Sequence, residues 1–297
     1  MNKRAYLLED LLDGTLWGPS NQVISSVVYD SREIEEADAF VCISGEKQDG
    51  HRFIDQAIRD GAKTIIGTDH KKLKSYAKDF PEVSFVGVSD SNLALAQLSS
   101  VVYGNPSESL LTIGVTGTNG KTTVSTFIYS LLNKLSLRTG CIGTAGIWDD
   151  KRKTTFKQTV PTTPEAPDIQ RVLNYFRENE MKAAVIESTS IAIEQKRLEA
   201  IDFDIAVHTN LTPEHLEFHG TMEAYKEAKL KLFDKSQCAI VNVDDPGMSG
   251  DLLERFQGQI LTYGLHESAD IRARNIRSGR DGTAFTLTVS NRKYSVN

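Results

Sequence analysis

The sequence has no excess of positive charge. Its 297 residues include 34 lysines and arginines against 40 aspartates and glutamates, which gives a formal net charge of -6. No diffuse positive field is available to neutralise a nucleic-acid backbone, so we expect no nucleic-acid partner. A polyanion would need a local binding site.

Long apolar runs are also absent. No stretch approaches the roughly 18 apolar residues that span a bilayer. Glu9 and Asp10 interrupt the N-terminal segment before the apolar region of a secretory signal can form. We therefore expect a cytoplasmic protein with no membrane insertion.

Cysteine is scarce as well. Cys42, Cys141 and Cys238 are widely spaced, odd in number and set among apolar neighbours. This pattern favours reduced core thiols over disulfides or a zinc site.

The remaining composition, with 39% hydrophobic and 25% charged residues, is typical of a globular protein, and the length suits two domains. In the first, short β-like runs alternate with helical patterns, which predicts an α/β unit. The β-like runs are 23–28, 39–43, 64–66 and 83–88, and the helical patterns are 51–60 and 92–103. Gly104 and Pro106 stop the last helix, so we expect domains at 1–104 and 105–297.

The second region begins with a strand at 110–115, a glycine turn and a helix at 121–134. Further strands are expected at 183–186, 205–208 and 239–243, separated by helices, which predicts a mostly parallel sheet covered by helices. The tail 270–296 alternates apolar and polar residues and predicts antiparallel strands. The expected fold class is therefore α/β, with a small N-terminal α/β domain before a P-loop-type sheet domain. The apolar residues of the 121–134 helix and its end are Phe127, Ile128, Leu131, Leu132 and Leu135.

The strongest chemical signal is the sequence Gly-Val-Thr-Gly-Thr-Asn-Gly-Lys-Thr-Thr at 114–123. Amides at a helix start point at a bound anion, Lys121 can reach terminal phosphates, and the Thr122 hydroxyl can ligate Mg²⁺. The spacing departs from the standard motif, because Val115 stands where its first glycine should be. The alternative to a phosphate site is a glycine turn that only tightens the connection between the strand and the helix.

Glu187 ends the strand expected at 183–186. Functional groups collect at the carboxyl ends of parallel strands, although position alone favours a solvated loop carboxylate. His215 and His219 lie in the segment 209–220, and a lone histidine is more often a packing or surface residue. The function of these three residues depends on their neighbours.

The segment 225–233 reads as a helix with three lysines, for which a solvated basic face is the ordinary interpretation. Lys229 shares a helical face with Tyr225 and Phe233 and therefore points inward, whereas Lys226 lies on another face. An inward lysine needs a partner or a modification.

Together these segments resemble the Mur ligases, ATP-dependent amide-forming enzymes of peptidoglycan synthesis. The resemblance rests on 116–123, 187–190, 210–220 and 228–229, and it runs along the whole chain. Within the family, the features at 29–32, 49–53, 162–164 and 219–225 are most similar to the branch that adds the third amino acid to UDP-N-acetylmuramoyl-L-alanyl-D-glutamate.

The resemblance implies a role for each matching residue. ATP phosphates would bind at Gly117, Thr118, Asn119, Gly120, Lys121, Thr122 and Thr123. Mg²⁺ would bind at Thr122, Glu187, His215 and Lys229, the last as an N-carboxylysine, and the catalytic set would be Lys121, Glu187, His215 and Lys229. The UDP-N-acetylmuramoyl dipeptide would bind at Tyr29, Ser31, Glu46, Lys47, Gln48, Thr162, Thr163, Thr189, Gln195 and Arg197.

The implied reaction forms an acyl phosphate on the substrate carboxylate, which the amine of a free amino acid then captures. The family's C-terminal amino-acid-binding domain has no counterpart in the sequence, so we expect the chain to be inactive alone. We also expect a monomer. Whether diaminopimelate or lysine is added stays open. Three alternative functions also stay open: a folylpolyglutamate synthase, a non-catalytic fragment that binds nucleotide and UDP-sugar peptide, and a P-loop NTPase of another role.

Overall fold

The computed structural model describes residues 6–7, 13–35, 38–45, 48–157, 160–280 and 282–297. The chain forms two compact units, each with its own sheet. The first unit comprises Met1–Ser109, Pro164–Asn179 and Gln195–Ile201, and the second comprises Leu110–Thr163, Glu180–Glu194 and Asp202–Asn297. The division into domains at residue 104 stays a prediction.

The first unit contains a five-stranded sheet in the order β2-β7-β6-β5-β4. All neighbours are parallel except β2, which runs antiparallel to β7. The strands are β2 (Thr15–Trp17), β4 (Val27–Val28), β5 (Ala39–Val41), β6 (Thr64–Gly67) and β7 (Ser84–Gly87). The helices are η2 (Ser31–Glu33), η3 (Gly50–Phe53), α1 (Ile54–Arg59), α2 (His70–Asp79), α3 (Ser91–Val102), η4 (Pro106–Ser109) and α5 (Ala166–Glu178).

The single strand expected at 23–28 is wrong. Val23–Ile24 forms β3, which pairs with β1 (Tyr6–Leu7) in a separate two-stranded sheet, whereas Val27–Val28 forms β4 and pairs with β5. Ser25 and Ser26 separate the two apolar pairs, and the Ser26 hydroxyl donates to the buried carboxylate of Asp38. The polar pair therefore lets each half of the run join a different sheet.

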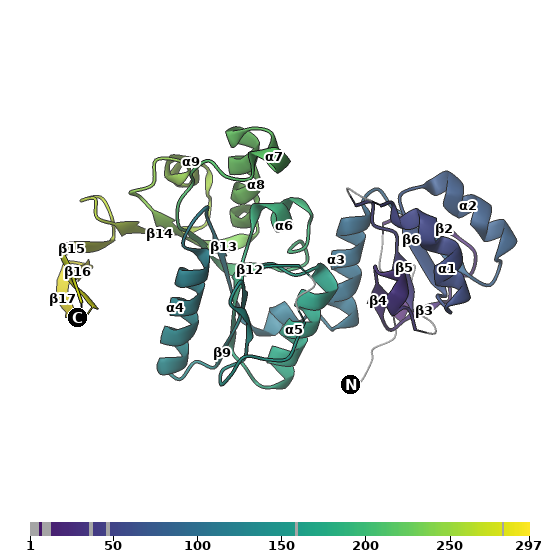
Figure 1. Cartoon of the computed structure of the whole chain (residues 1–297), viewed down its shortest axis with the longest axis horizontal. Helices are drawn as coiled ribbons and strands as arrows, with labels where there is room; N and C mark the ends of the chain where they lie inside the picture. Colours follow the sequence, from purple (N-terminus) through teal and green to yellow (C-terminus); the bar gives the residue numbers. More distant parts are fainter. Residues whose placement is uncertain (1–5, 8–12, 36–37, 46–47, 158–159, 281) are drawn as a thin grey trace. The chain divides into compact units, whose positions relative to one another are not determined.

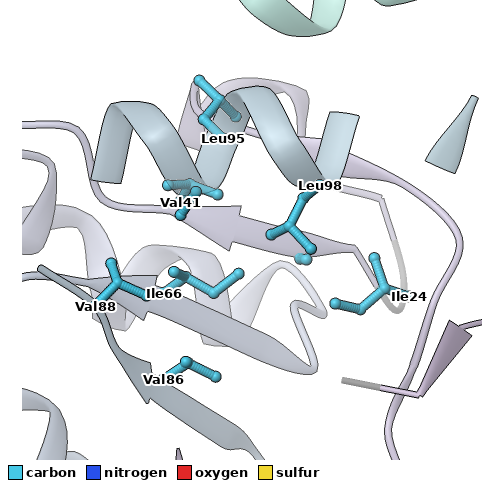
Figure 2. Close-up of a cluster of buried hydrophobic side chains, with 9 residues drawn as sticks. Ile24, Val41, Ile66, Val86, Val88, Leu95 and Leu98 are labelled. Carbon is cyan, nitrogen blue, oxygen red and sulfur yellow. The ribbon is translucent and has the colours of Figure 1, made fainter. Parts of the chain in front are cut away.

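Helices cover both faces of the five-stranded sheet. On one face, α3 directs Leu95 and Leu98 onto a cluster that includes Val41 and Ile66 (Figure 2). Helices α1 and α2 pack on the other face, over a second cluster around Phe40. The α3 helix begins where the Asp90 carboxylate accepts hydrogen bonds from the amides of the first turn.

The second unit contains a ten-stranded sheet in the order β10-β9-β11-β8-β12-β13-β14-β15-β16-β17. Its centre is parallel, and the last three strands form an antiparallel extension beyond β14 (Figure 1). The strands are β8 (Leu111–Thr116), β9 (Thr139–Gly143), β10 (Gly146–Trp148), β11 (Ala183–Glu187), β12 (Phe203–His208), β13 (Ser236–Asn242), β14 (Gln259–Gly264), β15 (Ile271–Gly279), β16 (Gly282–Val289) and β17 (Arg292–Val296). The expected mixed α/β class and the antiparallel tail are confirmed.

The helices of the second unit are α4 (Lys121–Lys134), α6 (Ser190–Glu194), α7 (Leu216–His219), α8 (Met222–Asp234) and α9 (Ser249–Arg255). The expected bounds of α4 are confirmed, but only some of its apolar residues pack against the sheet. Ile128 and Leu132 contact the cluster around Val115. In contrast, Phe127 and Leu131 are 63% and 58% exposed.

The three cysteines are free thiols, with Cys42 and Cys141 buried and Cys238 half-buried. Among the helices of the described segments, none combines the length and hydrophobicity that a bilayer crossing requires.

Truncating a leucine should lower the free energy of unfolding more in the buried cluster beneath α3 than at an exposed position. Leu98→Ala should lower the free energy of unfolding by about 2–5 kcal/mol, because Leu98 is fully buried in the cluster of Figure 2. Leu135→Ala, at a side chain that is 76% exposed, should change it by less than about 0.5 kcal/mol. Urea unfolding followed by circular dichroism measures both, and equal effects would contradict the assigned core.

Candidate functional site

The loop between β8 and α4 takes its shape from the segment that follows β12. The amide of Thr118 donates to the carbonyl of Asn210 at 2.8 Å, and the amide of Asn119 donates to the Asn210 side chain at 2.9 Å. The Thr209 hydroxyl donates to the carbonyl of Asn119 at 2.7 Å. Because β8 and β12 are parallel neighbours, their carboxyl ends bring these two segments together.

Two glycines are required in this loop. Gly117 has φ +149°, and a Cβ there would lie 1.8 Å from the Thr209 hydroxyl oxygen. Gly120 has φ +84° at the N-terminal cap of α4, and a Cβ there would meet open space. The first amides of α4 have no partner within the helix and lie at this open end. The loop therefore fits an anion such as a phosphate.

Lys121 folds back onto its own loop. Its ammonium donates to the carbonyls of Gly117 at 2.9 Å and Thr118 at 2.8 Å. Burial lowers the pKa of Lys121, and the carboxylates of Glu214 and Glu187 partly oppose that shift. The lysine thus places a positive charge beside the anion-binding end of α4.

Glu187 is a buried residue of the same site, with 1% of its surface exposed, so the solvated-loop interpretation is wrong. It is the last residue of β11, opposite Val115 of the parallel strand β8. Its carboxylate accepts from the Thr122 hydroxyl at 2.9 Å, from the Thr144 amide at 2.9 Å and from the Thr144 hydroxyl at 3.1 Å. No motif pointed to Thr144, which lies 43 residues before Glu187 in the chain.

Lys229 is 1% exposed and points inward from α8, as expected. Its ammonium donates to the carbonyl of Gly117 at 3.0 Å and lies 4.5 Å from the centre of the Tyr225 ring. Burial first, and then the positive charge of Lys121, lower the pKa of Lys229 to about 7. Lys226, on the other face, instead forms ion pairs at the surface.

Tyr225, which marks the inward face of its helix, connects several of these groups. It is fully buried, and its hydroxyl lies 3.2 Å from that of Thr118. Its ring lies 5.2 Å from that of His219 and 6.4 Å from that of His215. Burial raises the pKa of Tyr225, so the phenol keeps its proton.

The two histidines occupy different positions. His215 has left-handed backbone geometry with φ +55°, and its ring lies 3.8 Å from Glu214 and 3.5 Å from Glu217. The ring of His219 lies 3.0 Å from the Ser190 hydroxyl. Within the described ranges, no hydrogen bond joins His215 to Glu187, and no three His, Cys, Asp or Glu side chains gather as a metal site.

The residues expected to bind the dipeptide fall into two groups. In the second unit, the Thr163 hydroxyl lies 3.1 Å from that of Thr189, and the Thr162 hydroxyl lies 2.9 Å from that of Thr144. Thr144 also contacts Glu187, so a row of hydroxyls extends from the carboxylate. The row joins Thr144, which was not expected at the site, to Thr162, which was expected to bind the dipeptide.

The first unit holds the other expected contacts. Arg197 donates to the Gln195 side chain at 2.6 Å and pairs with Glu165 at 2.8 Å. Gln48 is exposed, and Ser31 begins the short helix η2. The expected residues Glu46 and Lys47 lie outside the described residues.

Of the expected dipeptide contacts that the structure describes, only Tyr29 lines the cavity of about 500 Å³ in the first unit. That cavity is bounded by residues around β4, the end of α3 and one side of α5. It is therefore separate from the positions of Gln48, Gln195 and Arg197.

His51, in the motif at 49–53, has a structural role. Its Nδ1 lies 2.6 Å from the Asp49 carboxylate, and its Nε2 accepts from the amides of Thr68 and Asp69. Because Nε2 is an acceptor, Nδ1 carries the proton and donates to Asp49. This buried ring fixes the segment that follows Gln48 to the end of β6.

Burial of the Lys229 ammonium predicts a pH-dependent stability difference. In CO₂-free buffer at pH 7, Lys229→Met should raise the free energy of unfolding by about 1–3 kcal/mol, because methionine has no charge to desolvate. In the wild type, the free-energy cost of burying the Lys229 ammonium is fully present below pH 7. It fades as the pH rises from about 7 towards 10.5, where the unfolded chain binds more protons than the folded one.

Urea unfolding at pH 7 and pH 9.5 measures this difference. The control is Lys231→Met, since Lys231 is half-exposed and pairs with Glu194. If the free energy of unfolding gained by Lys229→Met does not decrease as the pH rises, the assignment of a buried ammonium is wrong.

Comparison with protein-family models gives two matches. Residues 115–297 match the Mur ligase middle domain, and residues 23–103 match the Mur ligase family catalytic domain. A solved structure of UDP-N-acetylmuramoyl-L-alanyl-D-glutamate–2,6-diaminopimelate ligase superposes with a TM-score of 0.83 at 25% identity, covering 99% of this chain and 60% of that one. MurF ligase from Thermotoga maritima in complex with ADP superposes with a TM-score of 0.57 at 25% identity, covering 91% and 57%.

Two curated relatives carry the same ligase name, UDP-N-acetylmuramoyl-L-alanyl-D-glutamate–2,6-diaminopimelate ligase. The Clostridium perfringens protein is 35% identical over 300 residues, which cover 98% of this chain and 60% of that protein. The Halalkalibacterium halodurans protein is 38% identical over 293 residues, which cover 97% and 58%. The chain thus spans about 60% of the length of these relatives. The middle-domain match alone covers more than half of the chain, so the chain belongs to the Mur ligase family.

Proposed function

We propose that the protein is, or is part of, an ATP-dependent ligase that adds 2,6-diaminopimelate to UDP-N-acetylmuramoyl-L-alanyl-D-glutamate in peptidoglycan synthesis. The names of the 35–38% identical relatives support this substrate pair. We further propose that it acts in the cytoplasm as a monomer, as expected from the sequence.

The observation that carries the proposal is the buried lysine against the phosphate loop. Lys229 donates to Gly117, the residue that opens the loop, from a helix about 110 residues further along the chain. A P-loop NTPase of another role needs the loop but gives this buried ammonium no function. The proposed ligase gives the lysine a function as the precursor of an anionic carbamate beside the phosphate loop.

The proposed reaction takes place at the loop between β8 and α4. The amides at the start of α4 and the Lys121 ammonium would receive the ATP phosphates. The substrate carboxylate attacks the γ-phosphorus, ADP leaves, and the amine of the amino acid then displaces phosphate from the acyl phosphate. Lys121 offsets the negative charge on the phosphoryl group during the first step.

The Thr122–Glu187 pair fits Mg²⁺. A hydroxyl and a carboxylate 2.9 Å apart offer the hard oxygen ligands that this ion prefers. Thr122 and Glu187 would hold the ion, and His215 is proposed as a third ligand from the family resemblance. When bound, Mg²⁺ supplies positive charge that offsets the charge of the phosphates.

An ammonium at Lys229 does not fit a magnesium site, because like charges repel. We propose that Lys229 reacts as the neutral amine with CO₂, forming an N–C bond and releasing one proton, to give a carbamate. The pKa of about 7 leaves part of the lysine neutral at physiological pH, which this reaction requires. The product is an anion with two oxygens that suit Mg²⁺.

Ligand binding by the 297-residue protein tests the proposed function. Calorimetry should show binding of ATP with Mg²⁺ and of UDP-N-acetylmuramoyl-L-alanyl-D-glutamate. Lys121→Ala should weaken ATP binding by about 10–100-fold, since it removes a charge-assisted contact, and leave the UDP-dipeptide affinity unchanged. Lys134→Ala, at the exposed far end of α4, is the matched control.

Each outcome of this titration is informative. If neither ligand binds at millimolar concentration, the proposed function is wrong. If Lys121→Ala binds ATP as tightly as the wild type, the loop is only a structural turn.

The proposed carbamate predicts a spectroscopic signal. With ¹³C-bicarbonate, the wild type should show a protein-bound carbamate carbon that disappears on acidification and on removal of CO₂. Lys229→Ala should lack the signal, whereas Lys231→Ala should keep it. A spectrum without any Lys229-dependent carbamate, with Mg²⁺ present, would refute the modification.

A further inference from the structure

Helix α8 presents two side chains to consecutive residues of the phosphate loop. Lys229 donates to the carbonyl of Gly117, and Tyr225, one turn earlier, contacts the hydroxyl of Thr118 at 3.2 Å. Both side chains are at most 1% exposed, so water does not compete for either contact. The loop is therefore held from one helix at two adjacent points.

The hydrogen bonds of Thr118 determine which hydroxyl is the donor. The Thr118 hydroxyl oxygen accepts from the amide of Thr212 at 2.9 Å and donates to the carbonyl of Thr212 at 3.0 Å. A hydroxyl has one proton, so this arrangement leaves only an acceptor site for Tyr225. Tyr225 then donates to Thr118, and all the hydroxyl protons of the pair are satisfied.

The Thr118 backbone is tied to the anion-binding part of the loop. Its amide donates to Asn210, and its carbonyl accepts from the Lys121 ammonium at 2.8 Å. A displacement of Thr118 would therefore move Lys121 and the amides at the start of α4. Loops that bind phosphate with backbone amides depend on this kind of fixed geometry.

We propose that Tyr225 is a positioning residue for nucleotide binding: its hydroxyl fixes Thr118 and thereby the geometry of Lys121 and the phosphate-binding amides. The proposal rests on the proposed function of the loop. It gives Tyr225, a residue of α8, a role beyond packing in the hydrophobic core.

The contact of Tyr225 differs from that of Lys229 in one respect. Conversion of the Lys229 ammonium to a carbamate removes its positive charge and two of its three N–H donors. The phenol hydroxyl keeps its donor whatever the state of the lysine. Tyr225 therefore holds the loop independently of the proposed modification.

Tyr225→Phe tests the role of the hydroxyl, because it keeps the ring beside Lys229 and removes only the donor. Affinity for ADP with Mg²⁺ should fall by about three- to tenfold, the effect of one lost buried hydrogen bond. The matched control is Tyr129→Phe. Tyr129 lies on α4, and its hydroxyl donates to the backbone carbonyl of Asp149 at 2.8 Å, away from the loop. This control should lower the melting temperature to a similar extent and leave ADP affinity unchanged.

A second measurement does not need a ligand. In the nucleotide-free protein, Tyr225→Phe should accelerate hydrogen exchange at the amides of Thr118 and Asn119, and Tyr129→Phe should not. Unchanged ADP affinity together with unchanged loop exchange in Tyr225→Phe would overturn the proposal. If the wild type does not bind ADP, the proposed function fails, and loop exchange alone still decides whether Tyr225 positions the loop.

Discussion

The ammonium groups of two lysines, one buried and one half-buried, share one carbonyl oxygen. The arrangement of the site depends on this concentration of positive charge. Lys121 and Lys229 donate to the oxygen of Gly117 at 2.9 and 3.0 Å. Burial lowers the pKa of Lys229, and the positive charge of Lys121 acts in the same direction. Burying these charges costs free energy, and the phosphates of the proposed nucleotide would offset that cost at Lys121.

The sheet explains how residues distant in sequence reach this point. Strands β11, β8 and β12 are parallel neighbours, so Glu187, the phosphate loop and Asn210 emerge at the same edge. Helix α8 brings Lys229 and Tyr225 to the same loop, where they contact Gly117 and Thr118. Glu187 at the end of β11 and Lys229 on α8 thus reach the loop from different elements.

Local patterns predicted the elements that carry the site better than the contacts between them. Helical periodicity placed Lys229 inward, because the spacing to Tyr225 and Phe233 is a property of one helix, and it also gave the bounds of α4. The burial of Glu187 was not predictable in this way, since it depends on Thr122 and Thr144 from two other segments. The strand expected at 23–28 failed for the same reason, because its two halves pair with different partners.

The proposed carbamate sets stability against function at Lys229. A methionine of similar length would fill the space without the desolvation cost, yet it has no proton to lose and no nitrogen to modify. The fold accommodates the lysine with a single carbonyl and the face of Tyr225, which are weak partners for a buried ammonium. Weak partners leave the pKa low, and a low pKa keeps the amine available for chemistry. Stronger pairing with a carboxylate would stabilise the protein and hold the lysine in its unreactive, charged form.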